Sequence, residues 1–364
     1  MLNTFKNVGT KFRLEGEIYS FEVITIGNIN STYKVTYIRS DNSLKSYLFQ
    51  RINTNVFKNP VQIMENIDNV TTFIRKKNPD QITLHFHHTD DGLNYYLCEE
   101  NAFWRVVNYI ESKTYDYTDD LGIVESMGRA FGEFQTQLSD FDGSTLHETI
   151  PDFHNTKKRL DTLFSHIDED PFGRVAEVKA EIEYIASIRE KAVELSIKYA
   201  NGEIPKRVTH NDTKCNNVLF DRVKKEPIVV IDLDTIMPGM SIYDFADAAR
   251  FIVNTAVEDE PDTSKVSFDT EKFRALARGF VGATHTSLQP IEMDNLVKAT
   301  FSMTVEIAVR FLDDYIMGDT YFRCIYPKHN LVRTRCQLQL AKDIERKWNE
   351  LESIITDIRN NLAK

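Results

Sequence analysis

The character of the chain changes near residue 110, and this change constrains its fold more than any other feature. Residues 15 to 108 hold short runs that are rich in β-branched and aromatic residues and are separated by turns. After residue 110, apolar residues recur every three or four positions, which indicates amphipathic helices. We therefore predict an α+β fold of two lobes with a cleft between them: a small, mainly β lobe at residues 1–108 and a larger, mainly helical lobe at residues 109–364.

The first lobe is predicted to contain one main helix among its strands. Ile63, Ile67, Val70 and Ile74 lie at helical spacing within residues 59–77. Strands are expected on both sides of this helix, and "TDDG" is expected to form the turn of a hairpin. The expected strands are residues 17–27, 31–38, 45–53, 81–88 and 93–110.

The second lobe is predicted to consist mainly of helices. One is expected at residues 119–141, with Asp119 or Asp120 as its N-cap, and one at residues 175–202, ending at Asn201–Gly202. The last helix carries apolar residues from Leu338 to Leu362 at a rough spacing of three to four. Because this heptad pattern is irregular, packing on the body of the protein is favoured over a coiled coil.

Composition limits the possible partners. The chain has 364 residues and a formal net charge of −11, which argues against nucleic acid but not against a phosphorylated small molecule accompanied by a divalent cation. Its four cysteines show neither a disulfide framework nor zinc spacing. The N-terminus has no signal-peptide pattern, and no apolar run of about 18 residues is present. We expect a cytoplasmic protein with no membrane or protein partner.

Two neighbouring stretches concentrate the polar residues that chemistry requires. "RVTHNDTKCNNVLFD" covers residues 207–221, and "PIVVIDLDTIMPG" covers residues 227–239. Short apolar strands flank the polar loop of the first stretch, and the second delivers Asp232 at the end of an apolar strand. Phosphoryl transfer needs a cation clamp, an oriented hydroxyl and a proton acceptor, and these residues can supply all three.

Each polar residue can be given a role in phosphoryl transfer. Asn217 and Asp232 carry the oxygen ligands that Mg²⁺ prefers, and Asp212 can orient and deprotonate an acceptor hydroxyl. Lys214 can pair with the γ-phosphate oxygens of ATP, and His210 can brace the loop through hydrogen bonds. The chain therefore predicts an ATP and Mg²⁺ site here. The alternative is an ordinary loop with a buried histidine.

A zinc site is a further alternative, since His85, His87 and His88 lie close together in the sequence. On a strand, residues 85 and 87 share one face while residue 88 points away, and no cysteine or carboxylate has matching spacing. Two acidic residues that follow the motif, Asp244 and Asp247, are expected to brace the loop or cap a helix.

The motifs resemble those of known kinases. "HNDTKCNN" followed by a strand-borne aspartate is similar to the protein-kinase catalytic loop, and it is closer to the H-x-D-x-x-x-x-N and I-D elements of the aminoglycoside phosphotransferase and choline kinase superfamily. With "GNINSTYKV", "YLFQRIN", "DFADAARF" and "NLVRTR", nearly the whole chain resembles the N-acetylhexosamine 1-kinase branch.

The resemblance implies a protein-kinase-like bilobal fold in which the first lobe binds the nucleotide and the second binds the sugar. Such enzymes transfer the γ-phosphate of ATP to the anomeric C1 hydroxyl of N-acetylglucosamine or N-acetylgalactosamine. By matching position, the resemblance makes Asp212 the catalytic base and Asn217 and Asp232 the magnesium residues. It also makes Arg310 and Tyr321 candidate sugar contacts.

The first lobe departs from the kinase pattern. Thr25 stands where relatives often have a second glycine, so Gly27, Asn28, Asn30 and Ser31 are assigned near ATP or sugar by resemblance, with Asn28 also a candidate sugar contact. No V-A-I-K lysine is evident. In the comparable strand stand Gln50 and Arg51, and Arg51 is a candidate ATP contact that could pair with Glu65 or Asp68.

The segment that joins the lobes, including Asn108 and Tyr109, is expected to bind adenine through its main chain. Two rival functions remain from the sequence. One is the same phosphoryl transfer to an amino alcohol, an aminoglycoside or homoserine. The other is a catalytically silent regulator that binds nucleotide.

Overall fold

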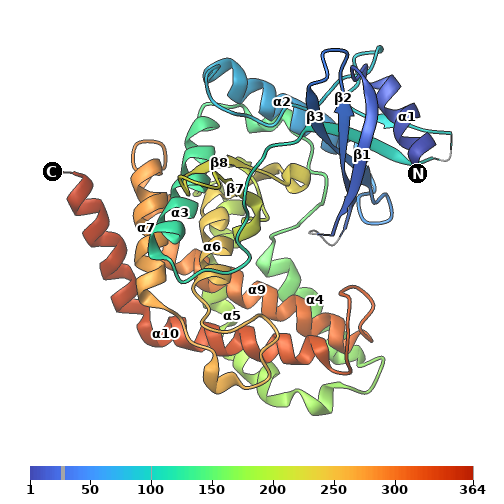
Figure 1. Ribbon diagram of the computed structural model, residues 1–364. Helices are drawn as coiled ribbons and strands as arrows, with labels where there is room; N and C mark the ends of the chain where they lie inside the picture. The colour runs from blue at the N-terminus through green and yellow to red at the C-terminus, as the bar shows by residue number, and fades with distance from the viewer. Residues whose placement is uncertain (26–28, 100, 364) are drawn as a thin grey trace.

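The computed structural model describes residues 1–25, 29–99 and 101–363. Figure 1 shows a sheet-containing N-terminal part above a larger helical part, so the predicted α+β fold is confirmed. The sheet is antiparallel with the order β1-β2-β3-β5-β4. Its strands are β1 Glu17–Ile24, β2 Ser31–Ile38, β3 Leu44–Ile52, β4 Tyr96–Leu97 and β5 Phe103–Asn108; the helices of this part are α1 Leu2–Lys11 and α2 Pro60–Lys77.

The two faces of the sheet have different surroundings. Helix α1 covers one face, where Phe5 is fully buried and meets the Trp104 ring edge-on at 6.1 Å between centroids. Thr32, Gln50 and Arg105 lie opposite one another on three adjacent strands. They share the other face of the sheet, because directly opposed residues of an antiparallel pair point the same way. That face is turned toward the helical part.

Residues 81–88 do not form the predicted strand. They make one isolated bridge, Phe86 to Val107. The edge of β5 that does not pair with β3 is divided between this segment and β4, which leaves room for little more. The predicted turn is present, since Gly92 has a φ of 76° and the Gly92 N–H donates to the Thr89 carbonyl at 3.0 Å. The sequence prediction missed helix α1.

The helical part is organised around α9, nearly all of whose side chains are buried. Asp120 is the N-cap of α3, accepting from the Gly122 N–H at 3.0 Å, and α5 ends at Asn201 before Gly202, as predicted. The helices are α3 Leu121–Gln137, α4 Thr156–Glu169, α5 Lys179–Ala200, α6 Ser241–Ile252, α7 Thr270–Thr284, α8 Pro290–Met293, α9 Leu296–Ile316 and α10 His329–Leu362, with 3-10 turns η1 Gly143–Thr145, η2 Val175–Glu177 and η5 Thr263–Lys265.

The last helix, α10, packs on the body rather than extending from it. Leu338, Ile344 and Leu351 are buried, and the Trp348 ring lies 5.9 Å from the Phe301 ring of α9. The predicted packing is therefore confirmed. Within the described ranges, no helix is both long enough and apolar enough to span a bilayer.

Helices α3 and α7 approach closely at glycines. A Cβ atom added to Gly279 of α7 would lie 2.0 Å from the Glu125 carbonyl oxygen of α3, and one added to Gly128 would lie 2.1 Å from the Leu276 carbonyl oxygen. Helix α3, held against α7 in this way, also packs against β8 and α6, which lie next to the motif loop. The division of the chain at residues 108 and 109 coincides with the end of β5 and, as a division into two domains, stays a prediction.

Candidate active site

The polar loop lies between two short strand pairs in the helical part. Strand β6 (Arg207–Thr209) pairs with β9 (Met237–Gly239), and β7 (Val218–Phe220) pairs with β8 (Pro227–Val230). The loop ends in the 3-10 turn η3 (Cys215–Asn217), and η4 (Leu233–Thr235) follows β8. The β7–β8 pairing continues into a hydrogen bond from the Ile231 N–H to the Asn217 carbonyl at 2.9 Å. Asn217 therefore lies beside Asp232.

Buried hydrogen bonds fix the course of this loop. His210 is fully buried; its Nδ1 accepts from the Asp212 N–H at 3.2 Å and its Nε2 donates to the Ile231 carbonyl at 2.8 Å. The Asp244 carboxylate accepts from the N–H groups of His210 and Asn211 at 2.9 and 2.8 Å. These hydrogen bonds confirm that His210 and Asp244 brace the loop, as predicted.

The second acid of α6, Asp247, acts in the same way. It accepts from the Thr213 N–H at 3.2 Å and forms a buried ion pair with Arg250 at 2.9 Å. Although burial disfavours its charge, Arg250 and Lys214 outweigh that effect and lower the pKa of Asp247. The loop is thus held by two carboxylates on one helix.

Asp212 contacts the two other polar side chains of its loop. Lys214 Nζ lies 2.7 Å from Asp212 Oδ1, and Asn217 Nδ2 donates to Asp212 Oδ2 at 3.2 Å and to the Asp212 carbonyl at 2.7 Å. The side chains of Asp212 and Lys214 are 25% and 43% exposed, so a ligand can reach both. Burial opposes the charge of Lys214, but Asp212 outweighs it and raises the pKa of the lysine.

Asp232 differs from its acidic neighbours because it has no cation partner. Asp212 pairs with Lys214, and Asp234 pairs with Arg105, whereas Asp232 forms no ion pair with any side chain of the described ranges. Asp232 is exposed to solvent, yet desolvation by the surrounding protein and the charges of Asp234 and Asp212 raise its pKa to about 6. An unpaired carboxylate between two others is a favourable position for a cation.

The donor set fits Mg²⁺. The amide NH₂ of Asn217 is turned to Asp212, which leaves its Oδ1 free for a ligand. With the carboxylate of Asp232, this gives two adjacent oxygen ligands. Mg²⁺ is usually held by one or two side-chain oxygens together with substrate phosphates, so a larger cluster is not required.

The described residues of the first lobe that were predicted to contact ATP do not lie together beside the polar loop. Gly27 and Asn28 lie outside the described residues. Ser31 and Arg51 are opposite each other, and Arg51 is opposite Trp104, which places both candidates on the α1 face of the sheet. Their contacts with ATP stay predictions. The suggested partners of Arg51 are paired elsewhere: Glu65 lies 2.8 Å from His147, and Asp68 lies 3.2 Å from His88.

The segment joining the lobes has several of its groups already engaged. The Asn108 Oδ1 lies 2.9 Å from His87 Nε2, and the Tyr109 N–H donates to the Ser46 carbonyl at 3.2 Å. Lys34 Nζ stands 4.4 Å from the centroid of the Tyr109 ring. Adenine binding by this segment stays a prediction. Because His87 contacts Asn108 while His88 contacts Asp68, these two histidines do not converge.

The structure brings Arg310 and Tyr321 together. Both line a recess of about 280 Å³ between α4, α9 and the segment that follows α9. Asp314 holds that segment in place by accepting from the N–H groups of Thr320, Tyr321 and Phe322 at 2.7 to 2.9 Å. The Tyr321 side chain is 71% exposed, so its ring is accessible at the edge of the recess.

A buried pair connects this recess to the polar loop. Glu306 lies one turn before Arg310 on α9, and its carboxylate is 2.8 Å from His154 Nδ1. The His154 Nε2 donates to the Asn211 carbonyl at 3.2 Å. Burial disfavours the imidazolium, but Glu306 outweighs it and raises the pKa of His154. The sequence prediction missed this pair, because its members are 152 positions apart.

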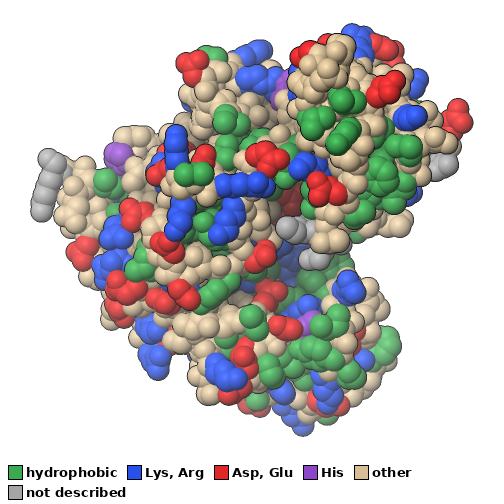
Figure 2. All heavy atoms as spheres, in the orientation of Figure 1, with side chains coloured by type: hydrophobic (Ala, Val, Ile, Leu, Met, Phe, Trp, Pro, Cys, Tyr) green, Lys and Arg blue, Asp and Glu red, His purple; other side chains and the backbone are tan. Residues whose placement is uncertain are grey.

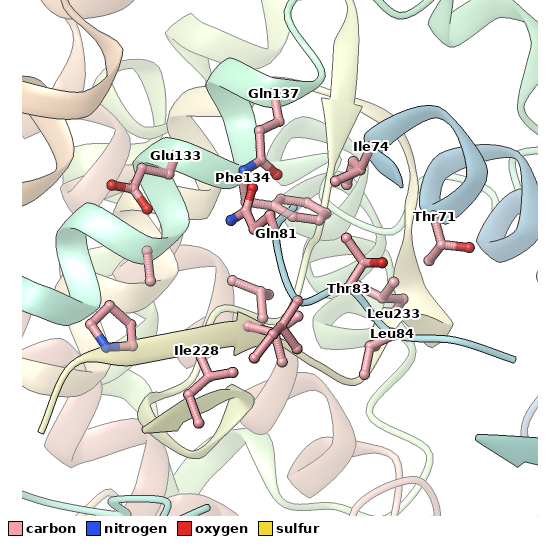
Figure 3. A pocket seen from close by; sticks show the side chains of 15 residues that line it. Thr71, Ile74, Gln81, Thr83, Leu84, Glu133, Phe134, Gln137, Ile228 and Leu233 are labelled. Carbon is pink, nitrogen blue, oxygen red and sulfur yellow. Dashed lines mark hydrogen bonds between the residues drawn. The ribbon is translucent and has the colours of Figure 1, made fainter. Parts of the chain in front are cut away.

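A second cavity, of about 70 Å³, lies between α2, α3 and β8 and is shown in Figure 3. Its walls are largely apolar, with Ile74, Phe134 and Leu233 among them, and none of the motif's polar residues lines it. Ligand pockets usually measure about 300–1,000 Å³, so this cavity is too small for a nucleotide. Figure 2 shows a separate hollow between the two parts of the molecule, with acidic and basic side chains inside it.

Comparisons with known proteins agree with this geometry. A model of the phosphotransferase enzyme family, APH, matches residues 20–277. An aminoglycoside phosphotransferase from Alicyclobacillus acidocaldarius has a similar structure, with a TM-score of 0.60, 12% identity and coverage of 97% of this chain and 96% of that one.

Two further structures share the fold. A microcompartment-associated aminopropanol kinase has a TM-score of 0.59 at 13% identity, covering 92% of this chain and 93% of that one. An amicoumacin kinase in complex with AMP-PNP and Ca²⁺ has a TM-score of 0.55 at 12% identity, covering 91% and 90%. The kinase-like bilobal architecture is therefore shared along nearly the full length of the chain.

Proposed function

Since the chain belongs to the phosphotransferase enzyme family, we propose that it transfers the γ-phosphate of ATP to the anomeric C1 hydroxyl of an N-acetylhexosamine, either N-acetylglucosamine or N-acetylgalactosamine. The products are the sugar 1-phosphate and ADP. The observation that carries the proposal is the grouping of Asp212, Asn217 and Asp232, in which Asp212 is paired with Lys214 while Asp232 has no cation partner among the described residues. A cytoplasmic location is part of the same proposal.

The side chains divide the work of transfer between them. Asn217 Oδ1 and the Asp232 carboxylate would hold Mg²⁺, which when bound neutralises charge on the nucleotide phosphates. Asp212 aligns the acceptor hydroxyl and takes its proton as the hydroxyl oxygen bonds to the γ-phosphorus and the bond to ADP breaks. Lys214, 2.7 Å from that carboxylate, is placed to contact the transferred phosphoryl oxygens.

The charges around the recess favour a sugar over an amine as the acceptor. Arg159 and Arg310 both line it, and neither forms an ion pair with another described residue. The two acids there are engaged: Asp313 contacts His166 at 2.7 Å, and Asp314 accepts three backbone N–H groups and the Asn330 amide. Guanidinium groups that are not neutralised by a carboxylate suit the oxygens of a sugar and repel an ammonium group.

A phosphate-transfer screen tests the proposal. The purified protein is given ATP and Mg²⁺ with N-acetylglucosamine, N-acetylgalactosamine, galactose, choline or kanamycin, and the products are identified by ³¹P NMR. We expect an anomeric sugar phosphate from one of the two N-acetylhexosamines. Choline or kanamycin as the sole good acceptor would contradict the acceptor assignment, and an Asp212→Asn variant supplies the background rate.

A further inference from the structure

A row of polar side chains crosses the inner face of the sheet. Gln50 Nε2 donates to Thr32 Oγ1 at 3.2 Å, and Arg105 Nε donates to Gln50 Oε1 at 2.9 Å. The V-A-I-K lysine of protein kinases would stand on a strand comparable to β3, and here that strand presents Gln50. Two cations share this face: Lys34 of β2 lies near Glu22 and Glu111, whereas Arg105 of β5 contacts Gln50.

Arg105 reaches across to the helical part. Its guanidinium forms an ion pair with Asp234, and both side chains are almost fully buried, at 3% and 4% exposure. Asp234 is two positions after Asp232, the candidate magnesium residue, so this ion pair joins the sheet to the metal motif. The attraction within a buried ion pair is largely offset by the cost of removing both charges from water. Such a pair is therefore better explained by the geometry that it specifies than by a gain in stability.

The second oxygen of Asp234 is also used. It accepts from Asn30 Nδ2 at 2.6 Å, and the Oδ1 of Asn30 accepts from the Asn53 N–H at 2.9 Å. Asn30 directly precedes β2 and connects the start of that strand to Asp234. Both oxygens of this carboxylate are thus bonded to the first lobe.

The turn that carries Asp234 also contacts the catalytic loop. Thr235 Oγ1 donates to the His210 carbonyl at 2.7 Å, and the Thr235 carbonyl accepts from Asn211 Nδ2 at 2.9 Å. Asp234 therefore contacts the sheet through Arg105 and the start of β2 through Asn30, and its neighbour Thr235 contacts the loop of Asp212.

We propose that Asp234, bonded to Arg105 and Asn30, is a positioning residue that holds β5 and the start of β2 in register with the metal-binding side chains, so that both parts of the molecule can contact one nucleotide. The inference rests on the proposed use of ATP and Mg²⁺ but is independent of the acceptor. Arg105 and Asp234 together take the part of the lysine–glutamate pair of protein kinases, which likewise joins two elements around the phosphates.

The test measures binding of AMP-PNP with Mg²⁺ by titration calorimetry, together with KM for ATP, KM for the acceptor and Tm. Asn30→Ala removes one hydrogen bond to a charged group and should weaken AMP-PNP binding about tenfold. Asn30→Asp places a second carboxylate against Asp234 and should weaken binding further. The double variant Asn30→Ala with Asp234→Asn should lose less affinity than the sum of the losses in the two single variants, because both changes remove the same hydrogen bond.

Asn55→Asp is the matched control. It makes the same change at an exposed position of the same lobe and should leave the affinity within about twofold of wild type. A rise in KM for ATP without a rise in KM for the acceptor is a result that a purely structural role would not give.

Two results would overturn the inference. One is an Asn30→Asp variant that binds AMP-PNP as wild type does. The other is a folded double variant, with a normal Tm, whose loss of affinity equals the sum of the two single losses. If choline proves to be the acceptor and the Asn30 variants still lose affinity for AMP-PNP as predicted, only the proposed acceptor is refuted.

Discussion

Replacing Asp212 by asparagine separates catalysis from folding. The amide keeps the size and shape of the carboxylate but removes its ability to accept a proton. It also removes the charge facing Lys214 Nζ at 2.7 Å, while Asn217 keeps its bond to the main-chain carbonyl of residue 212 at 2.7 Å. The loop itself is held by Asp244 and is expected to keep its course.

The expected magnitudes follow from these contacts. Loss of a general base lowers kcat by roughly 10²–10⁴-fold, or about 3–5 kcal/mol in activation free energy. The ion pair with Lys214 is partly exposed, so its loss should cost about 0–1 kcal/mol of unfolding free energy. Since about 1 kcal/mol shifts the Tm of a chain of this size by a few degrees at most, the Tm of Asp212→Asn should lie within about 4 °C of wild type.

The assay couples ADP release to NADH oxidation at saturating ATP and acceptor. Asp221→Asn is the matched control, because it is the same substitution at an exposed turn whose carboxylate accepts the N–H groups of Val223 and Lys224. Its kcat should stay within about twofold of wild type. A folded Asp212→Asn protein that retains more than about one tenth of the wild-type kcat would refute the role of Asp212 as base.

Three further changes probe other parts of the molecule. His154→Gln should lose stability in a pH-dependent way: the folded state holds the histidine's proton more tightly than the unfolded chain does, because the neighbouring carboxylate outweighs burial. The difference in unfolding free energy from wild type, measured with urea, should be largest below about pH 6.5 and should shrink as pH rises through the higher folded pKa. Gly279→Ala should lower the unfolding free energy by about 1–3 kcal/mol or more, since its Cβ would meet a backbone oxygen at 2.0 Å, whereas Gly282→Ala, with open space, should not destabilise. Arg310→Ala should raise KM for the sugar more than tenfold and leave KM for ATP nearly unchanged, in steady-state assays that vary one substrate at a time.

The grouping of the polar residues could be predicted because its geometry is local, while their catalytic roles stay a prediction. Asp212, Asn217 and Asp232 lie within one strand–loop–hairpin unit, so their sequence spacing nearly determines their spatial order. The helical segments could be predicted for the same reason, because a period of three to four positions is a property of adjacent residues. Helix α1 carries that signal too, in Phe5 and Val8 and in Phe12, which directly follows the helix, but the prediction did not use it.

The contacts that link the two lobes could not be predicted in this way. Arg105 and Asp234 are 129 positions apart, and no local pattern indicates which of several arginines will meet which aspartate. The failure at residues 81–88 has a related cause. Their composition suits a strand, but the number of bonds they make depends on how much of the β5 edge is left by β4.

The three carboxylates of the site show how partners rather than residue type decide a role. Asp212 faces Lys214 and stays partly exposed, which suits a group that must meet a hydroxyl. Asp234 is buried against Arg105, so it can fix the lobes but cannot readily take a metal ion. Asp232, two positions away, has no such partner and keeps its charge available, and a cation there would relieve the repulsion among all three acids. Coupling between the changes at Asn30 and Asp234 therefore tests whether the arrangement, and not merely the presence, of these acids determines nucleotide binding.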